Sequence, residues 1–203
     1  MKKPRTSGPI SARRIQRAFA PVLLLLIISA VGLGCQSSPG TSEGGRQSGD
    51  VYYARFAIQV DRGFCRSTNY RNAGGGITIP INMKVEFESK RRHRFKMRLT
   101  EGRSFVFEHV AKHTMDSAEE AFDSFFSPQP IDLSSFSAKE RKAIEAGSIE
   151  IGMSRQAVLT SIGPPPAVGT LSLESPTWKY WSNRFATFAV HFDANGRVSR
   201  IDR

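Results

Sequence analysis

Hydrophobic and polar residues alternate along much of the first half of the chain. Apolar side chains occupy every second position over residues 52–60, 77–87 and 95–99, and residues 104–110 continue the pattern. A period of two is typical of β-strands with one buried and one solvated face. The pattern predicts a small antiparallel β domain over residues 51–135, arranged as an SH3-like meander.

Helical spacing of apolar residues begins near residue 116. Asp116 is in position to cap a helix in which the three phenylalanines of residues 122–126 share one face. Ser137 and Glu140 have the spacing of a capping box, which predicts a second helix ending at Gly147. The chain is therefore expected to have an α+β fold.

The stretch GMSRQAVLTSIGPPP resembles a catalytic loop but has the signals of a short helix. Ser154 is a good N-cap, and Met153 and Val158 have the spacing of a hydrophobic staple. Gly163 is expected to end the helix in a left-handed conformation, and Pro164 prevents its continuation. Ser154 has no GxSxG elbow and no neighbouring histidine, so we expect no catalytic residue here.

Three further strands are expected after the prolines. They cover residues 178–181, 184–192 and 197–202, and DANG at 193–196 forms the turn between the last two. The region from 136 to the last residue thus reads as two helices followed by a three-stranded antiparallel sheet.

The order IEIGMSRQAVLTSIGPPP, WKYW and FATFAVHFDANGRV is similar to that of the SmpA/OmlA, or BamE-like, lipoprotein domain family. The similarity covers residues 137–203. It implies two helices packed on a three-stranded antiparallel sheet, and an accessory role in assembling β-barrel proteins of the outer membrane. The residues that match the family pattern, and that are expected to be structural, are Gly152, Met153, Ser154, Val158, Gly163, Pro164, Trp178 and Tyr180.

The first 34 residues have the organisation of a lipoprotein signal peptide. Basic residues without any acid precede an apolar run over 18–34, and VGLGC resembles a lipobox that ends at Cys35. Cys35 would carry the lipid, including palmitate, and anchor the chain in a membrane. An uncleaved anchor helix is the alternative, but Pro21 interrupts the apolar run, which is short for a bilayer.

Residues 36–50 are rich in glycine and serine and are expected to form a flexible tether after the lipidated cysteine. Gln36 follows Cys35, whereas an aspartate at that position retains some lipoproteins in the inner membrane. The sequence therefore favours a cell-envelope protein anchored in the outer membrane and facing the periplasm.

Charge narrows the range of partners. The chain has a formal net charge of +11, but six positive residues lie in the signal peptide, which leaves +5 for the rest. An exported lipoprotein does not meet nucleic acid, so that partner is excluded. Anionic lipid or an acidic protein surface remains open.

The most basic segment is KRRHRFKMR. Its charges alternate with the apolar residues 95, 97 and 99, so they fall on one face of a strand. This face is either a solvated hairpin surface that discourages aggregation or a site for lipid headgroups or an acidic partner. The candidate anion-binding or partner-binding residues are Lys90, Arg91, Arg92, Arg94, Lys96 and Arg98.

No pattern for catalysis or metal binding is found in the sequence. His109 and His113 are four residues apart, but Val110 stands where a zincin motif has its glutamate. Cys65 has no second cysteine for redox chemistry once Cys35 is acylated, and we expect it to be buried. The sequence thus predicts a non-enzymatic scaffold or adaptor without cofactor or metal, which binds an envelope protein such as the β-barrel assembly machinery. The alternative is a lipoprotein that binds peptidoglycan or a peptide through its SH3-like domain.

Overall fold

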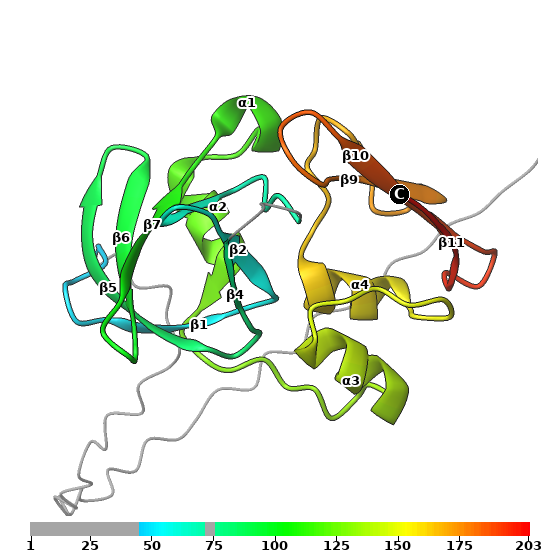
Figure 1. Ribbon diagram of the computed structural model, residues 1–203, viewed down its shortest axis with the longest axis horizontal. Helices are drawn as coiled ribbons and strands as arrows, with labels where there is room; N and C mark the ends of the chain where they lie inside the picture. The colour runs from blue at the N-terminus through cyan, green and yellow to red at the C-terminus, as the bar shows by residue number, and fades with distance from the viewer. Residues whose placement is uncertain (1–44, 72–75) are drawn as a thin grey trace, which may run out of the picture. The chain divides into compact units, whose positions relative to one another are not determined.

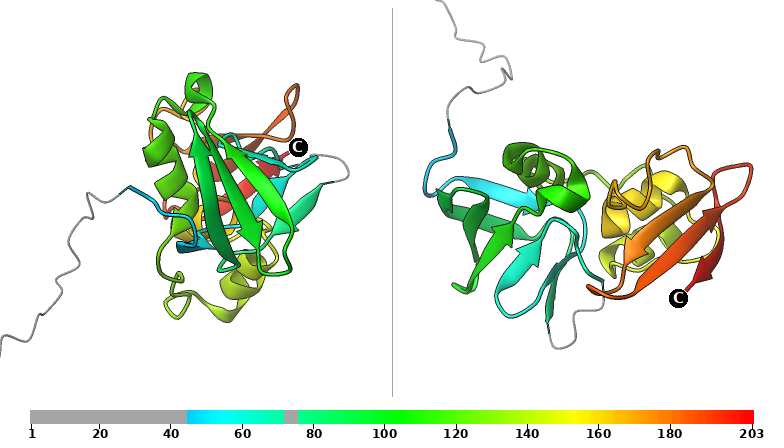
Figure 2. Two further views of the ribbon diagram at one scale, coloured as in Figure 1. Left: turned by 90° about the vertical axis from the view of Figure 1, so that its left-hand side faces the viewer. Right: turned by 90° about the horizontal axis from the view of Figure 1, so that it is seen from above.

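The computed structural model describes residues 45–71 and 76–203 (Figures 1 and 2), and these residues belong to one compact unit. The predicted signal peptide, Cys35 and the first part of the tether lie outside the described residues. Within the described part, no helix has the length and apolar character needed to cross a membrane. The fold is α+β, as expected, with two hydrophobic clusters that define two lobes.

A six-stranded sheet forms the first lobe, with strand order β3-β7-β6-β5-β1-β8. Hairpins connect β5, β6 and β7, which pair antiparallel, whereas β3 pairs with β7 in parallel. A separate two-stranded sheet consists of β2 and β4. The strands of this lobe are β1 (Val51–Ala54), β2 (Ile58–Val60), β3 (Phe64–Arg66), β4 (Ile77–Ile79), β5 (Lys84–Arg91), β6 (Arg94–Leu99), β7 (Ser104–Glu108) and β8 (Phe126–Ser127).

The expectation of a purely antiparallel meander was wrong. The segment 52–60 is interrupted and supplies β1 to one sheet and β2 to the other. The segment 77–87 breaks at Asn82, which has a φ of +61°. The Asn82 amide donates to the carbonyl of Ile131 at 2.9 Å and accepts from the Ile131 N–H at 2.7 Å. The alternation of apolar and polar residues indicates that a strand has a buried face. It does not indicate where the chain leaves one sheet and enters another.

Helix α2 (Ala118–Phe125) supplies the centre of the first core. Phe122 is fully buried, and the ring centroids of Tyr52, Phe95 and Phe126 lie 4.8–5.1 Å from its own. Ser117, not the predicted Asp116, caps this helix, because Ser117 forms a complete capping box with Glu120. Asp116 instead lies 3.0 Å from Nε2 of His109, just beyond the short and unpredicted helix α1 (Ala111–Thr114).

The last residues of the predicted tether contact the folded body. Arg46 forms ion pairs with Glu119 and Asp123 of α2, and its guanidinium lies 4.2 Å from the ring centroid of Phe122. The N–H of Gly49 donates to the carbonyl of Phe87 at 2.9 Å. Residues 46–50 therefore pack on the first lobe, because an arginine in a polar stretch finds acidic and aromatic partners that are distant in sequence.

The second lobe has two helices and a three-stranded antiparallel sheet of order β11-β10-β9. The helices cover one face of this sheet (Figure 2), and Trp178, Ile144 and Val158 are buried between them. The predicted signals act as expected: Ser137 and Ser154 cap the helices, and Gly147 follows the first one with a φ of +60°. The elements are α3 (Ala138–Glu145), α4 (Arg155–Ile162), β9 (Thr177–Trp181), β10 (Thr187–Phe192) and β11 (Val198–Asp202).

Hydrogen bonds from buried groups join the two lobes. The amide of Asn69 donates to the carbonyls of Ala57 and Ile162, at 3.2 and 3.1 Å. The N–H of Ala57 donates to the carbonyl of Ser161 at 3.0 Å. Ile81 of the first lobe packs into the second hydrophobic cluster. These contacts fix the second lobe against the first.

Candidate functional site

The predicted basic face exists on strand β6. Arg94, Lys96 and Arg98 are exposed, and the residues between them are buried, so the charges project from one side of the sheet. Sequence reasoning placed these charges correctly on a solvated face. It gave no information about the carboxylates on the neighbouring elements.

Most of these charges are paired with acids from β5, β7 or α2. Arg94 lies 2.6 Å from Glu108, and Lys96 lies 2.7 Å from Glu88. The hydrogen bond from Lys96 is the main reason that the pKa of Glu88 is lowered. Further pairs are Arg98 with Glu86 and Lys90 with Glu119. Such exposed pairs contribute little stability, but they reduce the positive potential of the face.

Arg91 and Arg92 differ from the other four candidates. Neither has a carboxylate within ion-pair distance among the described residues, and Arg92 lies in the β5–β6 turn with a φ of +54°. In the part of the chain that the structure describes, these two arginines are the candidates whose charge is not compensated by a carboxylate. Binding of an anion or an acidic partner to this face stays a prediction.

Glu140 organises the segment that resembles the BamE-like motif. Its carboxylate accepts hydrogen bonds from the Ser154 N–H at 3.0 Å and from the Ser137 hydroxyl at 2.9 Å. It also lies 3.1 Å from the guanidinium of Arg197, which precedes β11. Burial by itself would raise the pKa of Glu140, but the hydrogen bonds from Ser154 and Ser137 outweigh it and hold the pKa at about 2. One carboxylate thus connects both helix N-termini to the final hairpin.

The remaining motif residues are also structural. Trp178 is buried and donates to the carbonyl of Leu173 at 3.2 Å, and the Tyr180 hydroxyl donates to the carbonyl of Gly163 at 3.1 Å. Gly152 has a φ of +89° and donates to the carbonyl of Val198 at 2.8 Å. Every such contact ends on a neighbouring backbone. These motif residues therefore stabilise the lobe.

The predicted left-handed conformation of Gly163 was wrong in one respect. Its φ is +84° as expected, but its ψ is 177°, so the chain leaves α4 in an extended path toward Pro164. A Cβ on Gly163 would lie 2.6 Å from the ring of Phe56. The close approach of Phe56 from the first lobe, which is not visible in the local sequence, therefore leaves no room for a side chain at this position.

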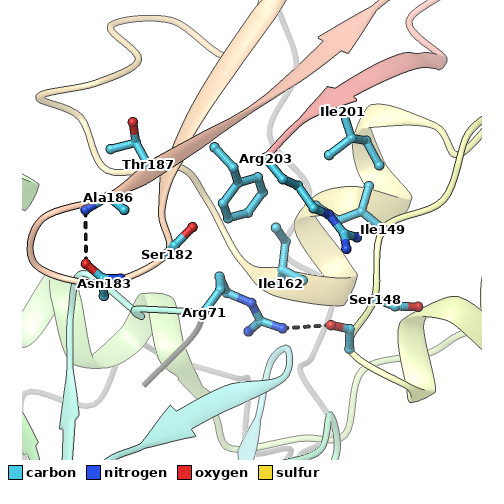
Figure 3. Close-up of a pocket in the computed structure, with 12 residues that line it drawn as sticks. Arg71, Ser148, Ile149, Ile162, Ser182, Asn183, Ala186, Thr187, Ile201 and Arg203 are labelled. Carbon is cyan, nitrogen blue, oxygen red and sulfur yellow. Dashed lines mark hydrogen bonds between the residues drawn. The ribbon is translucent and has the colours of Figure 1, made fainter. Parts of the chain in front are cut away.

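A pocket of about 470 Å³ lies beside α4 and the β9–β10 turn (Figure 3). Ile149, Ile162, Phe188 and Ile201 form its apolar wall, and Ser148 and Ser182 are among its polar lining residues. The two charged residues at its lining are Arg71, from the first lobe, and Arg203. Figure 3 shows both side chains extending toward the segment of Ser148 and Ile149.

Arg71 is held by backbone carbonyls rather than by an acid. Its two terminal nitrogens donate to the carbonyls of Ala57 and Gly147, each at 2.7 Å. Burial lowers the pKa of Arg71 to about 10, although the nearby Tyr180 raises it slightly. Sequence reasoning missed this residue because its partners are distant along the chain and consist of backbone atoms, which leave no sequence signal.

The histidines and the cysteine lie apart from this pocket's lining. His113 packs near Trp181, with ring centroids 5.9 Å apart, and His109 contacts Asp116. Cys65 is fully buried, as predicted, and burial raises the pKa of its thiol. Over residues 45–71 and 76–203, no group of three or more His, Cys, Asp or Glu side chains is placed to hold a metal ion.

Comparisons of the chain with protein-family models, with curated proteins and with solved structures gave no match.

Proposed function

We propose that the chain is a non-catalytic lipoprotein of the cell envelope that is anchored through acylated Cys35 and binds a protein partner through its second lobe. The anchor would lie in the outer membrane, with the folded body in the periplasm. The motif that resembles the BamE-like family supports a scaffold or adaptor role beside the β-barrel assembly machinery.

The observation that carries this proposal is the exposure of large apolar side chains on the loops of the second lobe. Leu171 is 91% exposed and Phe185 is 82% exposed, and Val168 and Leu173 are also exposed. These residues lie in the α4–β9 and β9–β10 loops. A contiguous exposed apolar patch is typical of a protein-interaction surface, and we propose that these four side chains form one.

Hydrogen bonds hold the α4–β9 loop in place. The Arg155 guanidinium donates to the carbonyls of Leu173 and Ser175, the latter at 2.9 Å. The Thr170 hydroxyl accepts from the N–H of Lys179 at 2.9 Å. A loop held from both sides keeps Leu171 outward, and a pre-ordered surface loses less entropy when a partner binds.

Affinity capture with the acylated full chain from detergent-solubilised envelope tests the adaptor role. The wild-type chain should recover subunits of the β-barrel assembly machinery, and the double variant Leu171→Ser, Phe185→Ser should recover at least about tenfold less, since apolar anchors dominate binding energy. Met115→Ser is the matched control, because Met115 is 74% exposed on the first lobe. Recovery of no assembly subunit, or equal recovery by the double variant, would contradict the role.

The anchor makes a separate prediction. Replacing Cys35 by alanine removes the thiol that would be acylated, so the mature chain should leave the membrane fraction, since a lipid chain supplies most of the binding free energy. Fractionation followed by immunoblotting measures this change, with Cys65→Ala as the control. Unchanged membrane association of the Cys35→Ala chain would rule out this anchor.

A further inference from the structure

The side chains of Arg71 and Arg203 both extend toward the Ser148–Ile149 segment of the pocket beside α4 (Figure 3), and apolar side chains form much of the remaining lining. We infer that this pocket binds a small anionic amphiphile, with a carboxylate at Arg71 and Arg203 and an apolar chain against Ile149, Ile162 and Phe188. This inference is independent of the adaptor role. Leu171 and Phe185, which we propose bind the protein partner, do not line the pocket.

The charge distribution favours an anion. Arg71 and Arg203 line the pocket, and no Asp or Glu side chain does. A guanidinium has five N–H donors, and Arg71 uses two of its groups for the carbonyls of Ala57 and Gly147. No carboxylate lies within ion-pair distance of Arg71 among the described residues. A buried cation that is satisfied by carbonyl dipoles alone retains an attraction for a counter-charge.

The shape favours a ligand with an apolar body. A volume of about 470 Å³ lies in the range of small-molecule sites, about 300–1,000 Å³. Ile162 is buried, and Phe188 and Ile201 are half-buried at the pocket wall, so their free surface faces the space. The planar guanidinium fork matches a carboxylate better than a single ammonium group would. A fatty acid of medium length combines both features.

Isothermal titration calorimetry with octanoate tests the inference on the full chain in nanodiscs of neutral lipid, with empty nanodiscs subtracted. Octanamide, which has the same apolar chain without the charge, is the matched ligand. Octanoate should bind at least about tenfold more tightly than octanamide, since a hydrogen bond to a charged group contributes about 1.5–3 kcal/mol. The result that would overturn the inference is equal affinity for the two ligands, or no binding of octanoate.

Two variants locate the binding site. Arg203→Gln should weaken octanoate binding about tenfold, and Ser182→Glu should abolish it by placing a carboxylate in the pocket. Arg203 is exposed and Ser182 is half-buried, and both line the pocket, with the Ser182 side chain directed into it (Figure 3). Arg200→Gln is the control, because Arg200 is exposed and pairs with Asp202 away from the pocket lining. Wild-type affinity in the Arg203→Gln chain would overturn the assignment of the site even if Ser182→Glu does not fold.

Discussion

Replacing Glu140 by alanine should lower the free energy of unfolding by about 3 kcal/mol. The residue is buried, and the variant would remove the acceptor for the Ser154 N–H and the Ser137 hydroxyl and the partner of Arg197. Hydrogen bonds to a charged group contribute about 1.5–3 kcal/mol, and breaking a buried pair costs about 3–5 kcal/mol. Arg197 is half-exposed and keeps access to water after the replacement. The expected loss is therefore at the lower end of the range for a buried pair, about 3 kcal/mol.

The loss of stability that follows replacement of Glu140 should depend on pH. The pKa of Glu140 falls from 4.5 to about 2 in the folded chain, so its charge is favoured by folding. The stabilisation is therefore fully present above about pH 4.5 and is lost as the pH falls toward 2. Urea unfolding of the wild type and of Glu140→Gln, repeated from pH 7 to pH 2.5, measures the difference. The difference in the free energy of unfolding between the two chains should become smaller as the pH falls through this range.

Glu145→Gln is the matched control for this experiment. Glu145 lies on the same helix α3 but is exposed and has no ion pair among the described residues. Its replacement should change stability by less than about 0.5 kcal/mol. A Glu140 variant that is as stable as the Glu145 variant at pH 7 would show that the carboxylate does not connect the helices and the hairpin.

Replacing Gly163 by alanine should destabilise the chain by about 2–6 kcal/mol. Its φ of +84° with ψ of 177° is a region open almost only to glycine, which costs other residues about 1–3 kcal/mol. In addition, the new Cβ would lie 2.6 Å from the Phe56 ring, and overpacking costs about 1–3 kcal/mol. Both penalties act where the two lobes meet.

Gly102→Ala separates the two contributions. Gly102 has a similar φ of +91°, but a Cβ there meets nothing within 4 Å, so only the backbone penalty applies. Thermal unfolding should show a clearly larger loss for Gly163→Ala than for Gly102→Ala. Adding Phe56→Leu should recover part of that excess. Equal losses for both glycine variants would show that Phe56 does not press on α4.

The elements of the second lobe were predictable because their signals are local. A capping box at Ser137, an N-cap at Ser154 and the DANG turn each act within a few residues, and the structure contains all of them. The same holds for the buried alternation of β6. Where a structural element depends only on residues within one turn or one strand, residue type and spacing are sufficient to predict it.

The interactions that position the candidate site could not be read in this way. Glu140 was recognised as half of a capping box, but its contacts with Ser154 and Arg197 join residues that are far apart in the chain. Arg71 binds carbonyl groups, which every residue possesses. The pairing of the basic face with Glu88 and Glu108 depends on strand register. These contacts between residues distant in sequence follow from tertiary packing, and a single sequence gives no direct sign of them.

Site-specific photo-crosslinking at Leu171 in intact cells is the most direct measurement of the proposed adaptor role. Leu171 is 91% exposed on the α4–β9 loop, and Lys142 on the exposed side of α3 is the comparison position. A photoreactive phenylalanine analogue at Leu171 should capture a subunit of the β-barrel assembly machinery in the membrane fraction, and the same analogue at Lys142 should not. Crosslinks that are absent at Leu171, or that are the same at both positions, would contradict a partner-binding surface on this lobe.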